Sequence, residues 1–222
     1  MGREMHRELP QSATKQGRVR LERRPQVFQA ALDVIADKGL EETRISDIAA
    51  AAGMSAGHIM YYFTSKSDML MQTLKWSDDQ FINGAKVAMK SLPTAQERLS
   101  CLVRLSIPES STDPAWILWL ETWARAPHDR NVASVKRRLE KTWITTLADV
   151  IKEGQQAGEF VELDAEHFAT LFSALIDGLV IRMMGGSGGM TKTRLLAICA
   201  QQIDAGLISG RTSYNWGSTD EP

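Results

Sequence analysis

The amino-acid sequence predicts an all-α protein, in which an N-terminal three-helix helix-turn-helix domain precedes a larger helical C-terminal domain. Along almost every segment the apolar residues recur three or four positions apart, which is the spacing of one face of a helix. No segment shows a convincing alternation of period two, so no strand is expected. The 222 residues are 43% hydrophobic and 24% charged, which is ordinary for a globular protein and sufficient for a sizeable core.

The N-terminal segment is basic although the whole chain is nearly neutral. The chain has 26 Lys and Arg residues against 27 Asp and Glu residues, but residues 1–24 carry seven basic and three acidic side chains. Residues 1–23 are polar and lack periodicity, so we expect a mobile basic arm. Such an arm either lies along a groove of a nucleic acid or is simply solvated. At the other end of the chain, residues 210–222 are expected to be frayed.

The cysteine and hydropathy patterns indicate a cytoplasmic protein without a metal, a cofactor or a membrane span. Cys101 and Cys199, the only cysteines, lie in apolar helical patterns typical of buried, reduced thiols. Their spacing to the four histidines matches no metal site. The N-terminus lacks the apolar core of a signal peptide. Residues 168–184 are the most apolar stretch, but Asp177 and Arg182 interrupt it, and it is short for a bilayer span.

Residues 24–68 predict a domain of three helices. The first is expected at Pro25–Lys38, because proline suits a first helical turn and a glycine follows Lys38. Thr43 is the expected N-cap of the second helix, which Gly53 ends. The third helix is expected over residues 55–63.

The second and third of these helices meet the requirements of a helix-turn-helix. The small side chains of Ala49 and Ala52 allow the helix axes to approach closely, and Gly53 gives the turn its backbone freedom. Ile59 and Phe63 lie one turn apart and are expected to face the core. The rest of the third helix keeps small, polar and aromatic groups that suit contact with a major groove. These groups are Ala56, Gly57, His58, Met60, Tyr61 and Tyr62.

The stretch TRISDIAAAAGMSAGHIMYYFTSKSDML resembles the DNA-binding domain of the tetracycline-repressor (TetR) family of transcription regulators. The matching residues are Ile48, Ala49, Ala52, Gly53, Ser55, Gly57, Tyr62, Phe63, Ser65 and Lys66. The family has an aromatic residue near position 60, where this chain has Met60, so a phosphate contact made there is either absent or supplied by Tyr61. The resemblance implies an all-helical homodimer with a DNA-reading head and a C-terminal ligand-binding core.

The resemblance also implies which residues contact a double-stranded DNA operator. The implied phosphate contacts are Thr43, Ser55, Tyr62 and Lys66, and the implied contacts to base edges or the nearby backbone are Arg44, Ala56, Gly57, His58 and Tyr61. A solvated surface histidine is the alternative for His58. Wedge packing between helices is the alternative for the pair Tyr61 and Tyr62.

Residues 69–209 predict the helical ligand-binding and dimerisation domain. Helices are expected over residues 65–93, 94–106, 113–127, 132–158, 165–184 and 192–208. The helix at 165–184 is apolar on two sides, and a monomer would leave one of them exposed. Pairing of the last two helices with those of a second copy would bury that side in a four-helix interface. The residues expected there are Phe168, Leu175, Leu179, Met183, Leu195, Ile198 and Gln202.

Four tryptophans in the C-terminal domain suggest a ligand pocket. Three share one face of the helix at 113–127, and the fourth belongs to the next helix. Indoles are also ordinary core residues, which is the alternative, but their N–H groups need partners and their shapes leave irregular space. An aromatic box with an interior carboxylate would favour a cationic ligand. The expected lining is Trp116, Trp119, Glu121, Trp123, Trp143, Phe172 and Asp177.

These observations predict a repressor of transcription that a small-molecule effector, cationic or aromatic, releases from a palindromic operator. An all-helical enzyme would need a nucleophile–base pair or a metal cluster, and the sequence shows neither. A protein-interaction module, or a small-molecule-binding protein without DNA readout, would explain the helical core. Either would leave Ser55, Tyr62 and Lys66 without a role.

Overall fold

The computed structural model describes residues 15–209, with side chains from Arg23 onward except that of Ser187. Within that range every regular element is a helix, which confirms the all-α prediction. The N-terminal head holds α1 (Lys15–Lys38), α2 (Ile45–Ala51) and α3 (Ala56–Ile59). The other helices are α4 (Lys66–Met89), α5 (Ala95–Ser106), α6 (Pro114–Arg125), α7 (Arg130–Gln156), α8 (Ala165–Met184) and α9 (Lys192–Ile203), with a 3-10 turn at Ser187–Gly189 and a π-helical turn at Asp204–Ile208.

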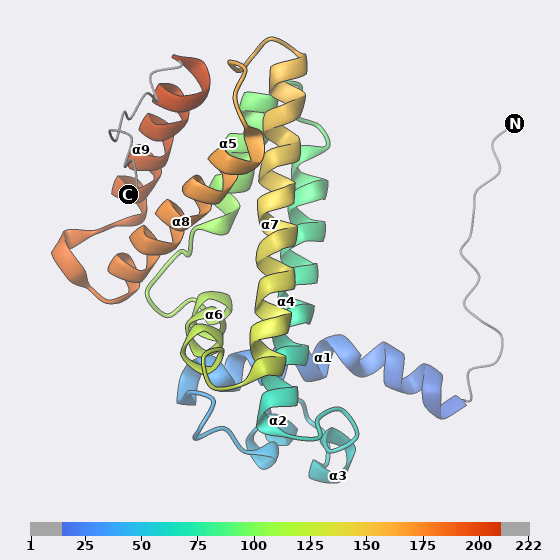
Figure 1. The fold of residues 1–222 in the computed structure, drawn as a ribbon. Helices are drawn as coiled ribbons and strands as arrows, with labels where there is room; N and C mark the ends of the chain where they lie inside the picture. Colours follow the sequence, from blue (N-terminus) through green and yellow to red (C-terminus); the bar gives the residue numbers. More distant parts are fainter. Residues whose placement is uncertain (1–14, 210–222) are drawn as a thin grey trace, which may run out of the picture.

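The long helices α4 and α7 run side by side and carry the other elements (Figure 1). The short helices α2 and α3 lie with α1 at one end of α4, whereas α5 and α8 pack on α7 further along and α9 packs on α8. Helix α6 lies between the two parts and contacts α1, α4 and α7. It is therefore placed to touch the head as well as the rest of the C-terminal domain.

Two clusters of buried side chains stabilise these two parts. One fills the C-terminal domain and takes residues from α4, α5, α7, α8 and α9. The other fills the head, but it also includes Leu118 of α6 and Val132 and Leu139 of α7. Since Leu118 is fully buried among residues of the head, a movement of α6 cannot leave the head unaffected.

Helix α1 begins earlier than the sequence predicts. It starts at Lys15 and contains Pro25, which was expected to lie at the helix start. The segment from Lys15 to Arg23 consists mainly of good helix formers without an apolar face, so propensity rather than periodicity produces the helix there. Residues 15–23, which were expected to belong to a mobile arm, are thus helical in the structure. Residues 1–14 of that arm, and the expected frayed tail at 210–222, lie outside the described residues.

The turn before α2 also differs from the prediction. Arg44, not Thr43, is the N-cap residue of α2. The Thr43 side chain is 2% exposed, and its hydroxyl donates a hydrogen bond of 2.7 Å to the carbonyl of Gly39. Gly39 has a φ of 75°, which reverses the chain after α1 and turns Thr43 inward. The backbone N–H of Arg44 is instead bound by the Asp47 carboxylate at 3.1 Å.

Candidate functional site

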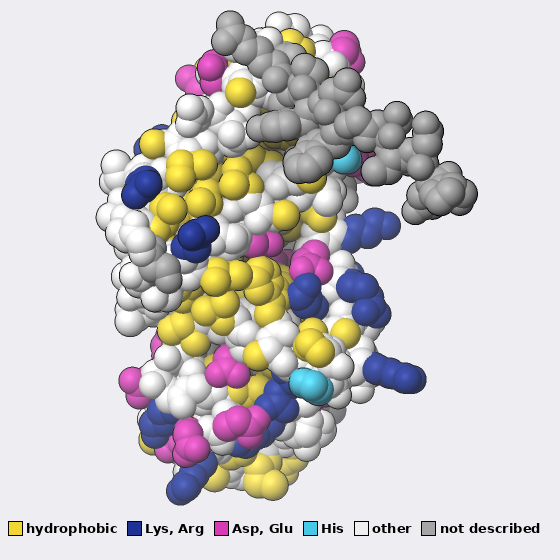
Figure 2. All heavy atoms as spheres, turned by 60° about the vertical axis from the view of Figure 1, so that its left-hand side comes forward, with side chains coloured by type: hydrophobic (Ala, Val, Ile, Leu, Met, Phe, Trp, Pro, Cys, Tyr) yellow, Lys and Arg dark blue, Asp and Glu magenta, His cyan; other side chains and the backbone are white. Residues whose placement is uncertain are grey.

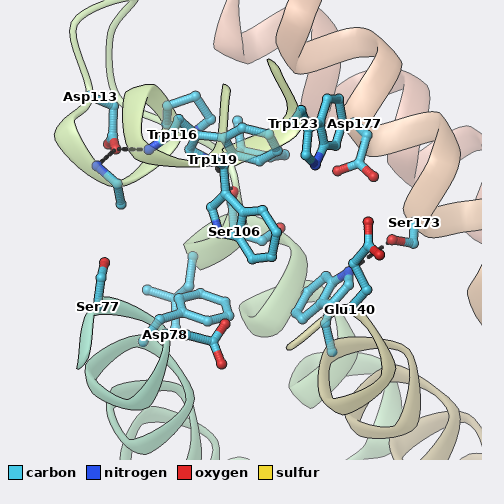
Figure 3. A pocket seen from close by; sticks show the side chains of 16 residues that line it. Ser77, Asp78, Ser106, Asp113, Trp116, Trp119, Trp123, Glu140, Ser173 and Asp177 are labelled. Atoms are coloured by element: carbon cyan, nitrogen blue, oxygen red, sulfur yellow. Dashed lines mark hydrogen bonds between the residues drawn. The ribbon is translucent and has the colours of Figure 1, made fainter. Parts of the chain in front are cut away.

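An aromatic cavity of about 160 Å³ lies in the C-terminal domain between α4, α6, α7 and α8 (Figure 3). Its volume is comparable to the roughly 150 Å³ engineered cavity that holds a benzene molecule. The aromatic lining consists of Phe81, Trp116, Trp119, Trp123 and Trp143, and the acidic lining of Asp78, Asp113, Glu140 and Asp177. The cavity therefore has room for a small ligand.

Hydrogen bonds hold two of the cavity's tryptophan rings in place. The Asp113 carboxylate caps α6 by accepting the backbone N–H groups of Ala115 and Trp116. The Trp116 indole N–H donates to the carbonyl of Ser106 at 2.8 Å, and the Trp143 indole N–H donates to the Ser173 hydroxyl at 3.1 Å. Two rings are therefore held before any ligand arrives, whereas the buried Trp123 Nε1 has no hydrogen-bond partner among the described residues.

Two carboxylates of the cavity are partly buried and have no ion-pair partner among the described residues. Burial raises the pKa of Asp78 to about 6, with a smaller contribution from the neighbouring charge of Asp79. Burial also raises the pKa of Asp177 to about 6; nearby Glu140 raises it further and Lys136 opposes the shift. Neither carboxylate makes a hydrogen bond or an ion pair with the described part of the chain. Each would gain from a cation bound beside it.

The Lys136 side chain places a cation beside two residues that line the cavity, Glu140 and Trp123. Its ammonium group forms an ion pair with Glu140 and lies 5.6 Å from the centre of the Trp123 ring. This is the geometry of a cation–π contact. A positive charge beside these acids and indoles is thus already part of the folded chain.

The cavity contains most of the predicted ligand residues but not all of them. Trp116, Trp119, Trp123, Trp143 and Asp177 line it. The prediction was wrong for two residues, which do not line it. Glu121 projects from α6 toward the head and accepts the backbone N–H of Leu40, and Phe172 is 3% exposed in the core, where its ring stacks on Phe168.

Sequence reasoning missed Asp78, Phe81 and Glu140. Asp78 carried a readable signal, because it lies between Leu74 and Phe81 on the apolar face of α4. An acid at such a position is either paired or functional. Glu140 could not be predicted in this way, because it lies in a run of charged residues whose pattern is typical of a solvated helix face.

Helix α3 lies at the outer end of the head (Figure 1). Ser55 caps α3 by accepting the backbone N–H of His58 at 3.3 Å, and the helix ends at Ile59, four residues before the predicted end. Arg44, Ser55, Ala56 and Gly57 are exposed, Tyr61 is 74% exposed, and His58 is half-buried. Tyr62 packs its ring beside those of Phe28 and Phe63, so wedge packing is confirmed for Tyr62.

Lys66 stands at the first turn of α4, near the exposed end of the head. Its ammonium group lies 3.6 Å from the Glu41 carboxylate and also donates to the Glu41 carbonyl. The same Glu41 carboxylate pairs with Arg125 at the end of α6. One acid thus connects the start of α4 with α6.

An apolar strip lies on the outer side of α8. Leu171 is 59% exposed and Ile181 is 39% exposed on this helix, and hydrophobic side chains gather on the side of the molecule that faces the viewer in Figure 2. Of the predicted interface residues, Phe168, Leu175, Met183 and Ile198 are half-buried and Gln202 is exposed. The prediction was wrong for Leu179 and Leu195, which belong to the core of the same chain. By length and composition α8 could cross a membrane, but its other side packs into the C-terminal core.

A helix-turn-helix head joined to a helical core with a ligand pocket defines a class of protein, the ligand-responsive transcriptional regulators. The comparisons with known proteins agree with that class. Residues 27–73 match the tetR family of bacterial regulatory proteins, and residues 95–207 match the C-terminal domain of BetI-type transcriptional repressors. The chain belongs to the tetR family and, within it, to the BetI-type regulators.

Individual relatives extend over most of the chain. It is 31% identical over 186 residues to the HTH-type transcriptional regulator BetI of Rhizobium meliloti (strain 1021), covering 83% of this chain and 89% of the relative. The BetI regulator of Escherichia coli (strain K12) is 27% identical, with 78% and 87% covered. A Saccharomonospora viridis transcriptional regulator, crystallised in complex with choline, has a TM-score of 0.76, 29% identity, and coverage of 84% and 98%. FadR of Bacillus subtilis, crystallised with stearoyl-CoA, has a TM-score of 0.65, 25% identity, and coverage of 82% and 96%.

Proposed function

We propose that this regulator responds to a small organic cation that binds in the aromatic cavity. The observation that carries the proposal is the lining itself, in which four indoles and several carboxylates surround about 160 Å³. The choline complex of the Saccharomonospora viridis regulator supports it, since choline is a quaternary ammonium ion. The long acyl chain of stearoyl-CoA, the ligand of Bacillus subtilis FadR, is apolar and would gain nothing from the carboxylates of this lining.

The chemistry of the lining favours a cation for two reasons. The faces of aromatic rings carry a partial negative charge and attract ammonium groups, an effect that grows when both partners are desolvated. Asp78 and Asp177 lose hydration in the folded chain without gaining a partner among the described residues. A bound cation would offset that loss, whereas an anion would be repelled.

For DNA binding we propose a homodimer in which the two α3 helices enter successive major grooves of a palindromic operator in the cytoplasm. The exposed strip of α8, with α9 beside it, offers the surface on which two copies pair. The proposed DNA contacts are Arg44, Ser55, Ala56, Gly57, His58, Tyr61 and Lys66. Thr43 and Tyr62 are left out, because both side chains are buried, and the Thr43 hydroxyl is bound to the Gly39 carbonyl.

Helix α6 is the proposed connection between ligand and DNA. Its tryptophans line the cavity, while its Glu121 and Arg125 contact Leu40 and Glu41 in the head. A ligand that displaces these rings would shift α6 and, through those contacts, the head. Because the two half-sites of an operator have a fixed spacing, such a shift weakens DNA binding.

The effector class is tested by comparing choline with 3,3-dimethylbutan-1-ol, an uncharged alcohol of nearly the same shape. Tryptophan fluorescence of the purified protein reports binding, because four indoles line the cavity. We expect saturable quenching by choline and at least tenfold weaker binding of the alcohol. Equal binding of the two compounds would contradict a cationic effector.

A further inference from the structure

The two cavity carboxylates that form no ion pair with the described chain stand on different helices. Asp78 belongs to α4, and Asp177 belongs to α8. Figure 3 shows the Asp177 and Glu140 carboxylates near each other beside Ser173, with Asp78 on the opposite side of the cavity. Among the described residues, Glu140 is the one of these three acids that forms an ion pair, with Lys136, whose charge also acts more weakly on Asp177. The cavity therefore keeps one unpaired negative charge at each of two ends.

No cation of the described chain reaches Asp78. This residue also borders the groove between α4 and α7, where Lys75, Lys86 and Arg138 lie. None of these three forms an ion pair with Asp78 in the described structure, and the neighbouring charge that shifts its pKa is that of Asp79, which is also negative. The Asp78 carboxylate is therefore available to pair with a cationic ligand.

Aromatic rings connect the two acidic ends. Phe81 follows Asp78 by one turn on α4, and Trp143 follows Glu140 by one turn on α7. The two rings contact each other, with centres 5.7 Å apart. Trp143 in turn donates its indole N–H to Ser173, one turn before Asp177 on α8. An apolar surface therefore runs from one acid to the other.

From this arrangement we propose that the effector is a small organic dication, with two ammonium groups separated by a short apolar chain. The proposal rests on the cationic effector proposed above and narrows its class. A ligand with one positive charge would leave the acid at the far end desolvated and unpaired, which is costly. A short α,ω-diamine would place one ammonium at Asp177 and the other at Asp78, with its methylene groups against Phe81 and Trp143.

The test is calorimetric titration of the purified full-length protein with matched amines, butylamine against 1,4-diaminobutane, and then diamines from 1,2-diaminoethane to 1,6-diaminohexane. We expect the best diamine to bind at least tenfold more tightly than the monoamine of the same length, with an optimum within the series. Asp78→Asn and Asp177→Asn should each lose that advantage and keep monoamine binding. Asp79→Asn, which removes an exposed charge next to Asp78, should keep the advantage.

Two results would contradict the proposal of a dicationic effector, and the titration distinguishes them. If choline binds but no diamine exceeds its monoamine, the effector is a monocation and the proposed cationic function stands. If choline, monoamines and diamines all fail to bind to protein that circular dichroism shows to be folded, the cationic effector itself is wrong.

Discussion

The Glu121 carboxylate accepts a hydrogen bond from the backbone N–H of Leu40, with the two atoms 3.2 Å apart. Glu121 belongs to the helix whose tryptophans line the cavity, and Leu40 follows the first helix of the head. The contact joins residues 81 positions apart in the sequence. The ligand-binding domain is therefore hydrogen-bonded directly to the backbone of the DNA-binding domain.

Glu121→Ala should weaken the coupling between effector and DNA. The variant removes this hydrogen bond, so we expect the loss of operator affinity on adding choline to shrink severalfold, since couplings of this kind are worth about 1–3 kcal/mol. Mobility shifts with and without choline measure the effect. Glu121→Gln keeps an oxygen acceptor and should restore the response. If Glu121→Ala lost as much operator affinity on adding choline as the wild type, this hydrogen bond would not transmit the effect of the ligand to the head.

Lys66→Ala should weaken binding to every DNA sequence to a similar extent. A lysine that neutralises one phosphate releases about one counterion, so the slope of log affinity against log salt should fall by about 1. Filter binding at several salt concentrations gives the slope. Glu41→Gln is the matched variant, because it removes the carboxylate beside Lys66 and should keep or increase affinity. An unchanged slope in Lys66→Ala would remove it from the phosphate contacts.

Asp78→Asn should stabilise the ligand-free protein at neutral pH. The pKa of Asp78 is raised in the folded state to about 6 from 3.8, so the folded state favours the protonated acid. The associated stability is present below pH 3.8 and is lost as pH rises toward 6. Allowing for its partial exposure, the substitution should gain on the order of 1 kcal/mol at pH 7.5 and little at pH 4.

Urea denaturation at the two pH values measures this gain. The exposed neighbour Asp79 serves as the control, and Asp79→Asn should change stability less. A gain that persists undiminished at pH 4 would contradict burial of the charge as its cause. The same titration predicts that choline binds more weakly as pH falls below 6, because Asp78 and Asp177 become neutral.

Leu171→Glu should convert the protein to a monomer. Leu171 is 59% exposed on α8, and a charge at the centre of an apolar interface is costly to bury. If the wild type is the proposed dimer, sedimentation should show a monomer for this variant, with loss of operator binding. Val87→Glu, at a residue 75% exposed on α4, should remain dimeric. An unaffected dimer in Leu171→Glu would place the interface elsewhere.

Much of the fold could be predicted from short-range signals. Capping residues such as Ser55, Thr94 and Asp113 begin helices where the sequence indicates, because they act within one turn. The start of α1 could not be predicted in this way, because no apolar face marks it. The inward turn of Thr43 depends on the left-handed Gly39, a tertiary reversal that side-chain type alone does not reveal.

The candidate site could be predicted only in part, for a similar reason. Helical spacing places Trp116, Trp119 and Trp123 on one face. Spacing cannot say which way Glu121 points relative to a neighbouring domain, and it projects to Leu40 instead of the cavity. Nor does it show which side of α8 the same chain already covers, so Leu179 and Leu195 were assigned to the interface although they are core residues.

The most direct test of the account measures release of an operator fragment, selected from genomic DNA, as choline is added. We expect choline to dissociate the wild-type complex, and Trp119→Leu, which removes a ring of the cavity, to need at least tenfold more choline. Trp76→Leu removes an indole that stacks on Phe28 in the head and should respond to choline as the wild type does. A wild-type complex that stays intact at saturating choline, or a Trp119→Leu complex that dissociates normally, would contradict control of DNA binding by a cation in this cavity.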